Sequence, residues 1–184
     1  MKIAKTFRIA APIDRVWPTI TDPEQVASCL PGCEQVDKVD ELNYKALVKV
    51  VVGPIRTQFK VDIACVEQRP PEYAAYETKG EEGGKSSRVK AISTLTLASL
   101  SEEETEVSYS SDLSIIGRLG KFGSGMMLKV ADSMGDDFVA ALKGVIEGQQ
   151  VDAGPKTMKT LNRAFWIGGA ILVAAFVIIA LLLA

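Results

Sequence analysis

The sequence predicts an α+β fold in which one strongly curved antiparallel sheet grips a long C-terminal helix. Between residues 34 and 116, apolar and polar residues alternate in segments separated by short turns, which is typical of an antiparallel meander with one buried face. From residue 122 onwards the apolar residues recur every four positions, which indicates an amphipathic helix. A first strand and two short helices precede the meander, so strands and helices occupy separate parts of the chain.

The first 33 residues predict a strand followed by two short helices. Residues 2–10 alternate as a strand does, and Pro12 suits the first turn of a helix that Pro18 weakens near its end. Asp22 offers an N-cap for the second helix because Pro23 can occupy its first helical position. Pro31-Gly32 ends this helix.

The meander contains at least five strands after residue 34. Gly53-Pro54 marks a turn, and Gly80–Gly84 is expected to be a loop. The acidic stretch Ser101–Glu106 is interpreted as a solvated turn, with a docking patch for a partner protein as the alternative. Two polar residues, Ser93 and Ser111, interrupt otherwise apolar alternate positions. The expected strands cover Tyr44–Val52, Thr57–Cys65, Glu72–Thr78, Val89–Leu97 and Val107–Ile115.

The long helix is predicted from the glycine-rich stretch Gly117–Gly125 up to Gly148, which ends it. The glycines match no phosphate-binding motif, so this stretch is interpreted as a flexible entry to the helix or as a gate. The apolar stripe consists of Phe122, Met126, Val130, Met134, Phe138 and Leu142, joined by Met127, Val145 and Ile146. The expected organisation is a domain at 1–148, a polar linker at 149–163 and a membrane anchor at 164–184.

The anchor is predicted because Ala164–Ala184 contains no charged residue. At about 1.5 Å per residue such a helix covers roughly 30 Å, the hydrocarbon thickness of a bilayer. Lys156, Lys159 and Arg163 precede it, which places the folded domain in the cytoplasm of a single-pass protein. A buried helix of a soluble oligomer is the alternative.

Composition excludes several kinds of chemistry. The chain contains no histidine, which removes histidine bases, histidine-activated nucleophiles and histidine-ligated metals. Before residue 151 the chain carries 18 basic and 22 acidic residues, that is 21 minus 3 against 23 minus 1, and this balance argues against nucleic acid as a partner. Buried candidates for catalysis are few (Tyr109, Asp14 and Asp22), and they form no recognisable constellation.

The three cysteines do not predict a metal centre. Cys29 and Cys33 are separated by three residues rather than two. Cys65 stands alone, so the chain has no second cysteine pair. A four-cysteine cluster cannot be assembled within one chain. Buried thiols packed as small apolar groups are favoured over a redox pair.

Several stretches resemble the family of the carbon monoxide dehydrogenase G subunit, which belongs to the START/Bet v 1-like (helix-grip, SRPBCC) superfamily. The resemblance covers roughly residues 1–147 and is most specific from Asp22-Pro23-Glu24 to Leu30-Pro31-Gly32-Cys33-Glu34, with Gly53-Pro54-Ile55 in support. It implies an accessory role, without enzymatic activity, beside a molybdenum-containing, hydroxylase-type dehydrogenase at the inner face of the cytoplasmic membrane. Which dehydrogenase is served does not follow from the resemblance.

Three functions are compatible with these observations. The domain binds a lipid-soluble respiratory quinone (menaquinone or ubiquinone) in an apolar cavity, or it is a docking scaffold with a filled core, or it is a cyclase- or hydratase-like enzyme. The lack of histidine makes the enzyme the weakest of these. The methionines suit either a cavity or core packing. The expected ligand-binding residues are Trp17, Leu30, Phe59, Val61, Ile63, Tyr109, Leu113, Met126, Met127, Val130, Met134 and Phe138.

Overall fold

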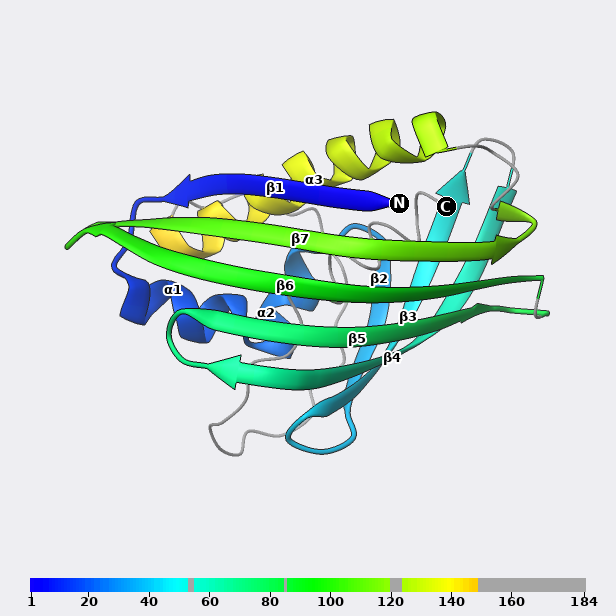
Figure 1. Cartoon of the computed structure of the whole chain (residues 1–184), viewed down its shortest axis with the longest axis horizontal. Coiled ribbons are helices and arrows are strands. Elements are labelled where there is room, and N and C mark those ends of the chain that lie inside the picture. The colour runs from blue at the N-terminus through cyan, green and yellow to red at the C-terminus, as the bar shows by residue number, and fades with distance from the viewer. Residues whose placement is uncertain (53–54, 85, 120–123, 149–184) are drawn as a thin grey trace.

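The structure is a computed structural model, and it describes residues 1–52, 55–84, 86–119 and 124–148. Within these ranges the side chains at positions 50, 52, 55, 124 and 126–131 are not described. Seven strands form one antiparallel sheet in the order β1-β7-β6-β5-β4-β3-β2 (Figure 1). The strands are β1 (Lys2–Ile9), β2 (Cys33–Lys38), β3 (Asn43–Val52), β4 (Ile55–Arg69), β5 (Tyr73–Glu82), β6 (Ser87–Ser101) and β7 (Glu104–Gly117).

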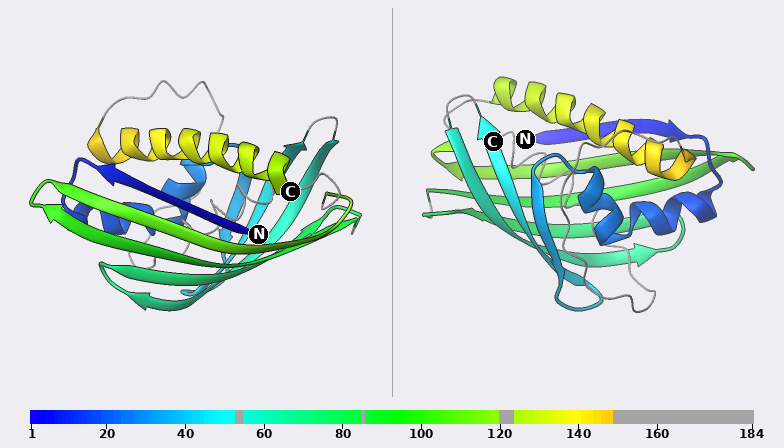
Figure 2. Two further views of the ribbon diagram at one scale, coloured as in Figure 1. Left: turned by 45° about the horizontal axis from the view of Figure 1, so that its top comes forward. Right: turned by 180° about the vertical axis from the view of Figure 1, so that it is seen from behind.

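The sheet curves around a helix, as the sequence predicts. Helix α3 (Ser124–Glu147) lies across the concave side of the sheet, and the two short helices lie on the same side near one end (Figure 2). The α+β fold with a curved antiparallel sheet and a C-terminal helix is therefore confirmed. Alternation along each strand assigns one row of side chains to the inner face, towards α3, and the other row to the outer face.

The second N-terminal helix begins where its capping residue predicts, whereas the first begins just after Pro12, which was expected inside its first turn. Helix α1 (Ile13–Ile20) follows Pro12 and buries Val16, Trp17 and Ile20. Helix α2 (Pro23–Cys29) is capped by Asp22, whose carboxylate accepts hydrogen bonds from the backbone N–H groups of residues 24 and 25 at 2.8 and 2.9 Å. These bonds satisfy two donors that no helical carbonyl can reach, and such caps contribute about 1 kcal/mol.

Strand β5 is longer than its sequence indicates. Gly80, Glu81 and Glu82 were expected in a loop, but they continue the strand because they pair with β4 on one side, and Gly80 and Glu81 also pair with β6 on the other. The expectation of a loop over Gly80–Gly84 is wrong for these three residues, since two flanking strands outweigh the low strand propensity of glycine and glutamate. The extension brings Glu82 to the inner face, opposite Phe59.

The acidic turn between β6 and β7 is shorter than predicted. Strand β6 runs to Ser101 and β7 starts at Glu104, so the stretch Ser101–Glu106 lies mostly in strands. Thr105 is fully buried, and its hydroxyl donates to the carbonyl of Ala11 at 2.8 Å. The interpretation of the whole stretch as a solvated turn is therefore wrong beyond residue 103.

Helix α3 buries one side against the rest of the domain. Phe138, Leu142 and Ile146 are buried, whereas Val145 is exposed, so its expected place in the apolar stripe is wrong. Lys5 of β1 bonds Asp132 and Asp136 of the helix at 3.2 and 2.6 Å. Gly148 follows with a φ of 74°, the left-handed conformation that commonly terminates a helix. The predicted end of the helix is confirmed.

Several predicted segments lie outside the described residues. At the C-terminus these are the predicted linker at 149–163 and the predicted anchor at 164–184. The turn at Gly53-Pro54 and residues 120–123 of the glycine-rich stretch also lie outside them. Within the described ranges, no helix combines the length and the apolar character that a membrane crossing requires.

Candidate functional site

The candidate site is the inner face of the sheet opposite α3. It collects eight of the twelve predicted ligand-binding residues into one buried cluster, and Met134 packs against this cluster from α3. The side chains of Met126, Met127 and Val130 lie outside the description, although their backbones belong to α3. The eight clustered residues are Trp17, Leu30, Phe59, Val61, Ile63, Tyr109, Leu113 and Phe138.

Strand pairing explains why these residues share one face. Val61 and Ile63 of β4 alternate with outward-facing Lys60 and Asp62, and Ile63 lies opposite Tyr44 of β3. On β7, the same alternation turns Tyr109 and Leu113 inward. The sequence pattern therefore predicted the face correctly, because a strand that buries one side fixes the direction of every second residue.

Hydroxyl groups interrupt the apolar inner face at its centre. Tyr109 Oη donates to Ser93 Oγ at 3.1 Å, and Ser93 Oγ donates to Ser111 Oγ at 2.8 Å. Thr78 on the neighbouring strand β5 is buried, and its Oγ1 has no hydrogen-bond partner in the described structure. From the sequence, Tyr109 was an expected ligand-binding residue, and Ser93 and Ser111 interrupt the apolar alternation, whereas Thr78 was not predicted to belong to the site.

Burial keeps the tyrosines of this face neutral. Desolvation raises the pKa of Tyr109 and of Tyr76 well above the usual value for tyrosine. On β3, burial raises the pKa of Tyr44 to about 12, and its Oη donates to the carbonyl of Glu41 at 3.0 Å. These hydroxyls act as uncharged donors and acceptors at any physiological pH.

One carboxylate lies on the inner face, at the end where β5 and β6 meet. Glu82 is buried, and its Oε1 accepts a hydrogen bond from Arg118 in an ion pair. Desolvation alone would raise the pKa of Glu82, but the hydroxyls of Ser87 and Thr57 and the Arg118 guanidinium together lower it. Glu82 Oε2 is buried without a hydrogen-bond partner in the described structure.

The three cysteines lie in two kinds of environment. Cys29 and Cys65 are buried, whereas Cys33 is half-buried, so the expected burial holds for two of the three described thiols. Burial raises the pKa of Cys29 and of Cys65, which lowers the thiolate fraction at neutral pH. No disulfide links these three described residues.

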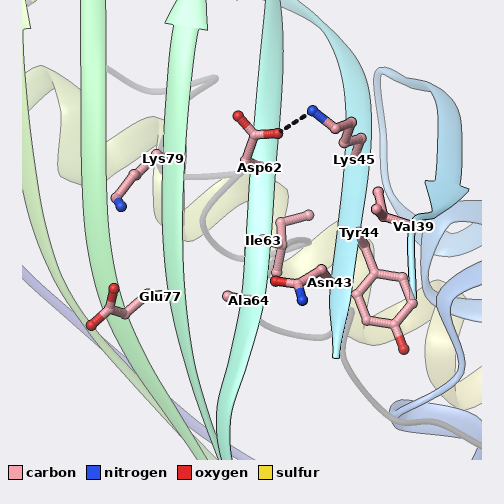
Figure 3. A pocket seen from close by; sticks show the side chains of 9 residues that line it. All are labelled: Val39, Asn43, Tyr44, Lys45, Asp62, Ile63, Ala64, Glu77 and Lys79. Carbon is pink, nitrogen blue, oxygen red and sulfur yellow. Dashed lines mark ion pairs between the residues drawn. The ribbon is translucent and has the colours of Figure 1, made fainter. Parts of the chain in front are cut away.

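A hollow lies on the outer surface of the sheet. A groove of about 300 Å³ is bordered by β3, β4, β5 and the turn before β3. Figure 3 shows Lys45 and Asp62 joined by an ion pair of 2.9 Å, with Glu77 and Lys79 nearby. Because these charged side chains are exposed and largely balance one another, the groove does not favour one class of ligand.

The described residues offer no evident catalytic or metal centre. Among them no three acidic or cysteine side chains converge in a way that would hold a metal ion. Asp22 caps α2 and Asp14 is exposed in the first turn of α1, so both aspartates have structural explanations. The inner face therefore offers apolar side chains and uncharged hydroxyl groups, but no recognisable catalytic constellation among the described residues.

A curved seven-stranded antiparallel sheet that holds a C-terminal helix against an apolar inner face defines a START-like protein of the Bet v 1 type. The sequence matches the CoxG family, described as the G subunit of carbon monoxide dehydrogenase, over residues 6–147. The chain belongs to this family. No protein of curated function shows significant sequence similarity to it.

Solved structures share the fold at low sequence identity. A conserved protein from Geobacillus kaustophilus superposes with a TM-score of 0.75 and 21% identity, over 80% of this chain and 96% of its own. A START superfamily protein from Mycobacterium smegmatis superposes with a TM-score of 0.63 and 14% identity, over 81% of this chain and 99% of its own. The ZhuI aromatase/cyclase from Streptomyces sp. R1128 superposes with a TM-score of 0.61 and 18% identity, over 84% of this chain and 98% of its own. At these identities the likeness establishes the fold alone.

Proposed function

We propose that this chain is a membrane-anchored, non-enzymatic accessory protein of a molybdenum-containing carbon monoxide dehydrogenase or a related hydroxylase. It binds a lipid-soluble respiratory quinone, menaquinone or ubiquinone, between the sheet and α3. The observation that carries the proposal is the inner face, which is apolar except for a short row of uncharged hydroxyls, Glu82 at one end, and Lys5 of β1, which is paired with α3. Membership of the CoxG family supports the link to the dehydrogenase.

An apolar inner face suits the chemistry of a quinone. The isoprenoid tail and most of the ring are apolar, so leaving the bilayer requires an equally dry environment in the protein. Burial of apolar surface contributes about 25 cal/mol per Å². The strands β4 to β7 supply most of this apolar surface, and the expected ligand residues Phe59, Val61 and Leu113 all contribute to it.

The C-terminal segment supports the membrane location. Residues 164–184 carry no charge, and Lys156, Lys159 and Arg163 precede them. In the proposal this segment spans the cytoplasmic membrane once and holds the N-terminal domain on the cytoplasmic side, beside the lipid in which quinones dissolve. A dehydrogenase recruited to the domain then lies close to the quinone pool.

A docking scaffold without a ligand is the competing function. The observation that favours it is the extent of burial, because the clustered inner-face residues are at most 9% exposed. Such burial is what a filled core gives. In the scaffold function the dehydrogenase is recruited through the surface alone.

Added bulk at the centre of the inner face separates these two functions. Ala91 on β6 faces inward between Thr78 and Leu113, and Ile92 next to it faces outward. If the face borders a ligand space, Ala91→Trp fills that space at little cost in stability and displaces the ligand. In a packed core the same change strains the structure by about 1–3 kcal/mol or more.

The experiment compares Ala91→Trp with Ile92→Trp as the matched control in the full chain. We expect both variants to melt near the wild-type temperature, and only Ala91→Trp to lose the quinone that organic extraction recovers from wild type. A melting temperature that collapses in Ala91→Trp alone, with no quinone recovered from wild type, would replace the quinone carrier by the docking scaffold.

A further inference from the structure

The inner face carries five hydroxyl-bearing side chains at the centre of the three strands β5, β6 and β7. Each is at most 3% exposed, which is rare for serine and threonine. Apolar side chains occupy the neighbouring inward positions, so the hydroxyls form a defined polar row on an otherwise apolar surface. The row consists of Tyr76 and Thr78 on β5, Ser93 on β6, and Tyr109 and Ser111 on β7.

The strand register places these residues side by side. Tyr76 lies opposite Ser93, and Ser93 lies opposite Ser111. Thr78 lies opposite Ala91, which makes it the diagonal neighbour of Ser93. Directly opposed residues are about 5 Å apart and diagonal ones about 7–8 Å, so a ligand group of a few atoms can contact several of the hydroxyls at once.

Thr78 is the member of the row that lacks a partner. Tyr109, Ser93 and Ser111 bond one another at 3.1 and 2.8 Å, whereas Thr78 Oγ1 has no partner in the described structure. A buried hydroxyl without a partner destabilises a protein, and valine would fill the same volume without that penalty. A threonine at this position therefore indicates a hydrogen-bond acceptor that belongs to a bound molecule.

The charge distribution limits what that molecule is. No residue of the row is charged, because burial keeps both tyrosines protonated. Lys5, the inward-facing cation on β1, is held by Asp132 and Asp136 of α3. Glu82 lies four residues along β5 from Thr78, about 13 Å away along the strand. A carboxylate or phosphate headgroup would meet no available cation among the described inner-face residues, whereas a carbonyl oxygen needs none.

We propose that Thr78 donates a hydrogen bond to a carbonyl oxygen of the bound quinone and that the hydroxyl row selects a neutral, carbonyl-bearing ring over anionic lipids. The inference rests on the proposed function and adds to it the polar contact that orients the ring. The serines and Tyr109 position the ring from the adjacent strands, and the apolar positions around the row contact the rest of the molecule.

The test compares three threonine variants of the full chain in detergent. Thr78→Val removes the hydroxyl and keeps the shape, and Thr78→Ser retains a hydroxyl. Thr94→Val is the matched control, because Thr94 lies on the outer face of β6, where its hydroxyl bonds Ser110 at 2.9 Å. Calorimetric titration with ubiquinone-1, a short-chain quinone, and separately with oleate gives the dissociation constants, and detergent alone supplies the blank.

We expect Thr78→Val to weaken ubiquinone-1 binding about fivefold to tenfold, which is the loss of one neutral hydrogen bond. Thr78→Ser and Thr94→Val should stay within about twofold of wild type, the scatter of such substitutions. Wild type should prefer the quinone to oleate, and Thr78→Val should lose part of that preference without a fall in melting temperature. Quinone binding by Thr78→Val at wild-type affinity would overturn this inference and leave the proposed function standing. A wild-type chain that binds no ubiquinone-1 would overturn both.

Discussion

The ion pair between Glu82 and Arg118 gives the sharpest prediction of stability. Glu82 is 2% exposed, and Arg118 is the cation that it contacts. Replacement of Arg118 by alanine leaves a buried carboxylate without its counter-charge, a change that costs about 3–5 kcal/mol when both partners are buried. Because the Arg118 side chain is 49% exposed, water compensates part of the loss. We therefore expect Arg118→Ala to cost about 2 kcal/mol, which corresponds to roughly 4–8 °C in melting temperature.

The chain provides a matched control for this prediction on the outer face of β5 and β6, next to Glu82. Arg88 bonds Glu81 at 3.0 Å, and both side chains are exposed. Exposed pairs of this kind contribute about 0–1 kcal/mol, so Arg88→Ala should melt close to wild type. The assay is thermal and urea denaturation of both variants at pH 7, followed by circular dichroism. Equal destabilisation by the two variants would show that burial does not increase the contribution of the Glu82–Arg118 pair to stability.

The same pair predicts a dependence on pH. The native environment lowers the pKa of Glu82 below its ordinary value of 4.5. A lowered carboxylate pKa contributes stability that is fully present above the unfolded value and is lost as the pH falls through the folded value. The free energy of unfolding should therefore decline below about pH 4.5, and Glu82→Gln should decline less steeply over that range. Parallel acid profiles of the two proteins would contradict this assignment.

Three further predictions concern the anchor, the thiols and one glycine. Truncation after Gln150 should move the protein from the membrane to the soluble fraction of fractionated cells, and a truncated protein that stays with the membrane would disprove the anchor. Substitution of Cys29 and Cys33 together by alanine should leave quinone binding intact, and a folded double variant without binding would restore the redox pair. Gly117→Ala should lower the melting temperature by several degrees, because φ is 109° and a Cβ would lie 2.8 Å from the Cα of Ser87. Unchanged melting would contradict that strain.

The sequence predicts the architecture well because alternation and a four-residue period report burial directly. The inner positions of β4 and β7, including Ile63 and Leu113, follow from the alternation itself, since a strand with one buried side fixes its own faces. Strand ends were less predictable. Residues 80–82 look like a loop by composition, yet pairing with strands distant in the sequence keeps them in the sheet.

The polar part of the candidate site depends on register, which the sequence does not contain. Ser93 and Ser111 stand out as interruptions of an apolar pattern, but nothing in the sequence places them opposite each other. Thr78 resembles any threonine of a strand until its inward direction and its lack of a partner are known. A polar residue at an inward position of an alternating segment is the pattern by which such residues can be found.

Mass spectrometry of an organic extract from the purified full chain tests whether the inner face holds a quinone. Ala91→Trp, which keeps the same C-terminal segment, is extracted in parallel to subtract quinone that the segment and the detergent carry. We expect close to one respiratory quinone per wild-type chain and a small fraction of that in Ala91→Trp. Equal traces of quinone in both extracts would contradict this expectation, and the docking scaffold would then be the function of this domain.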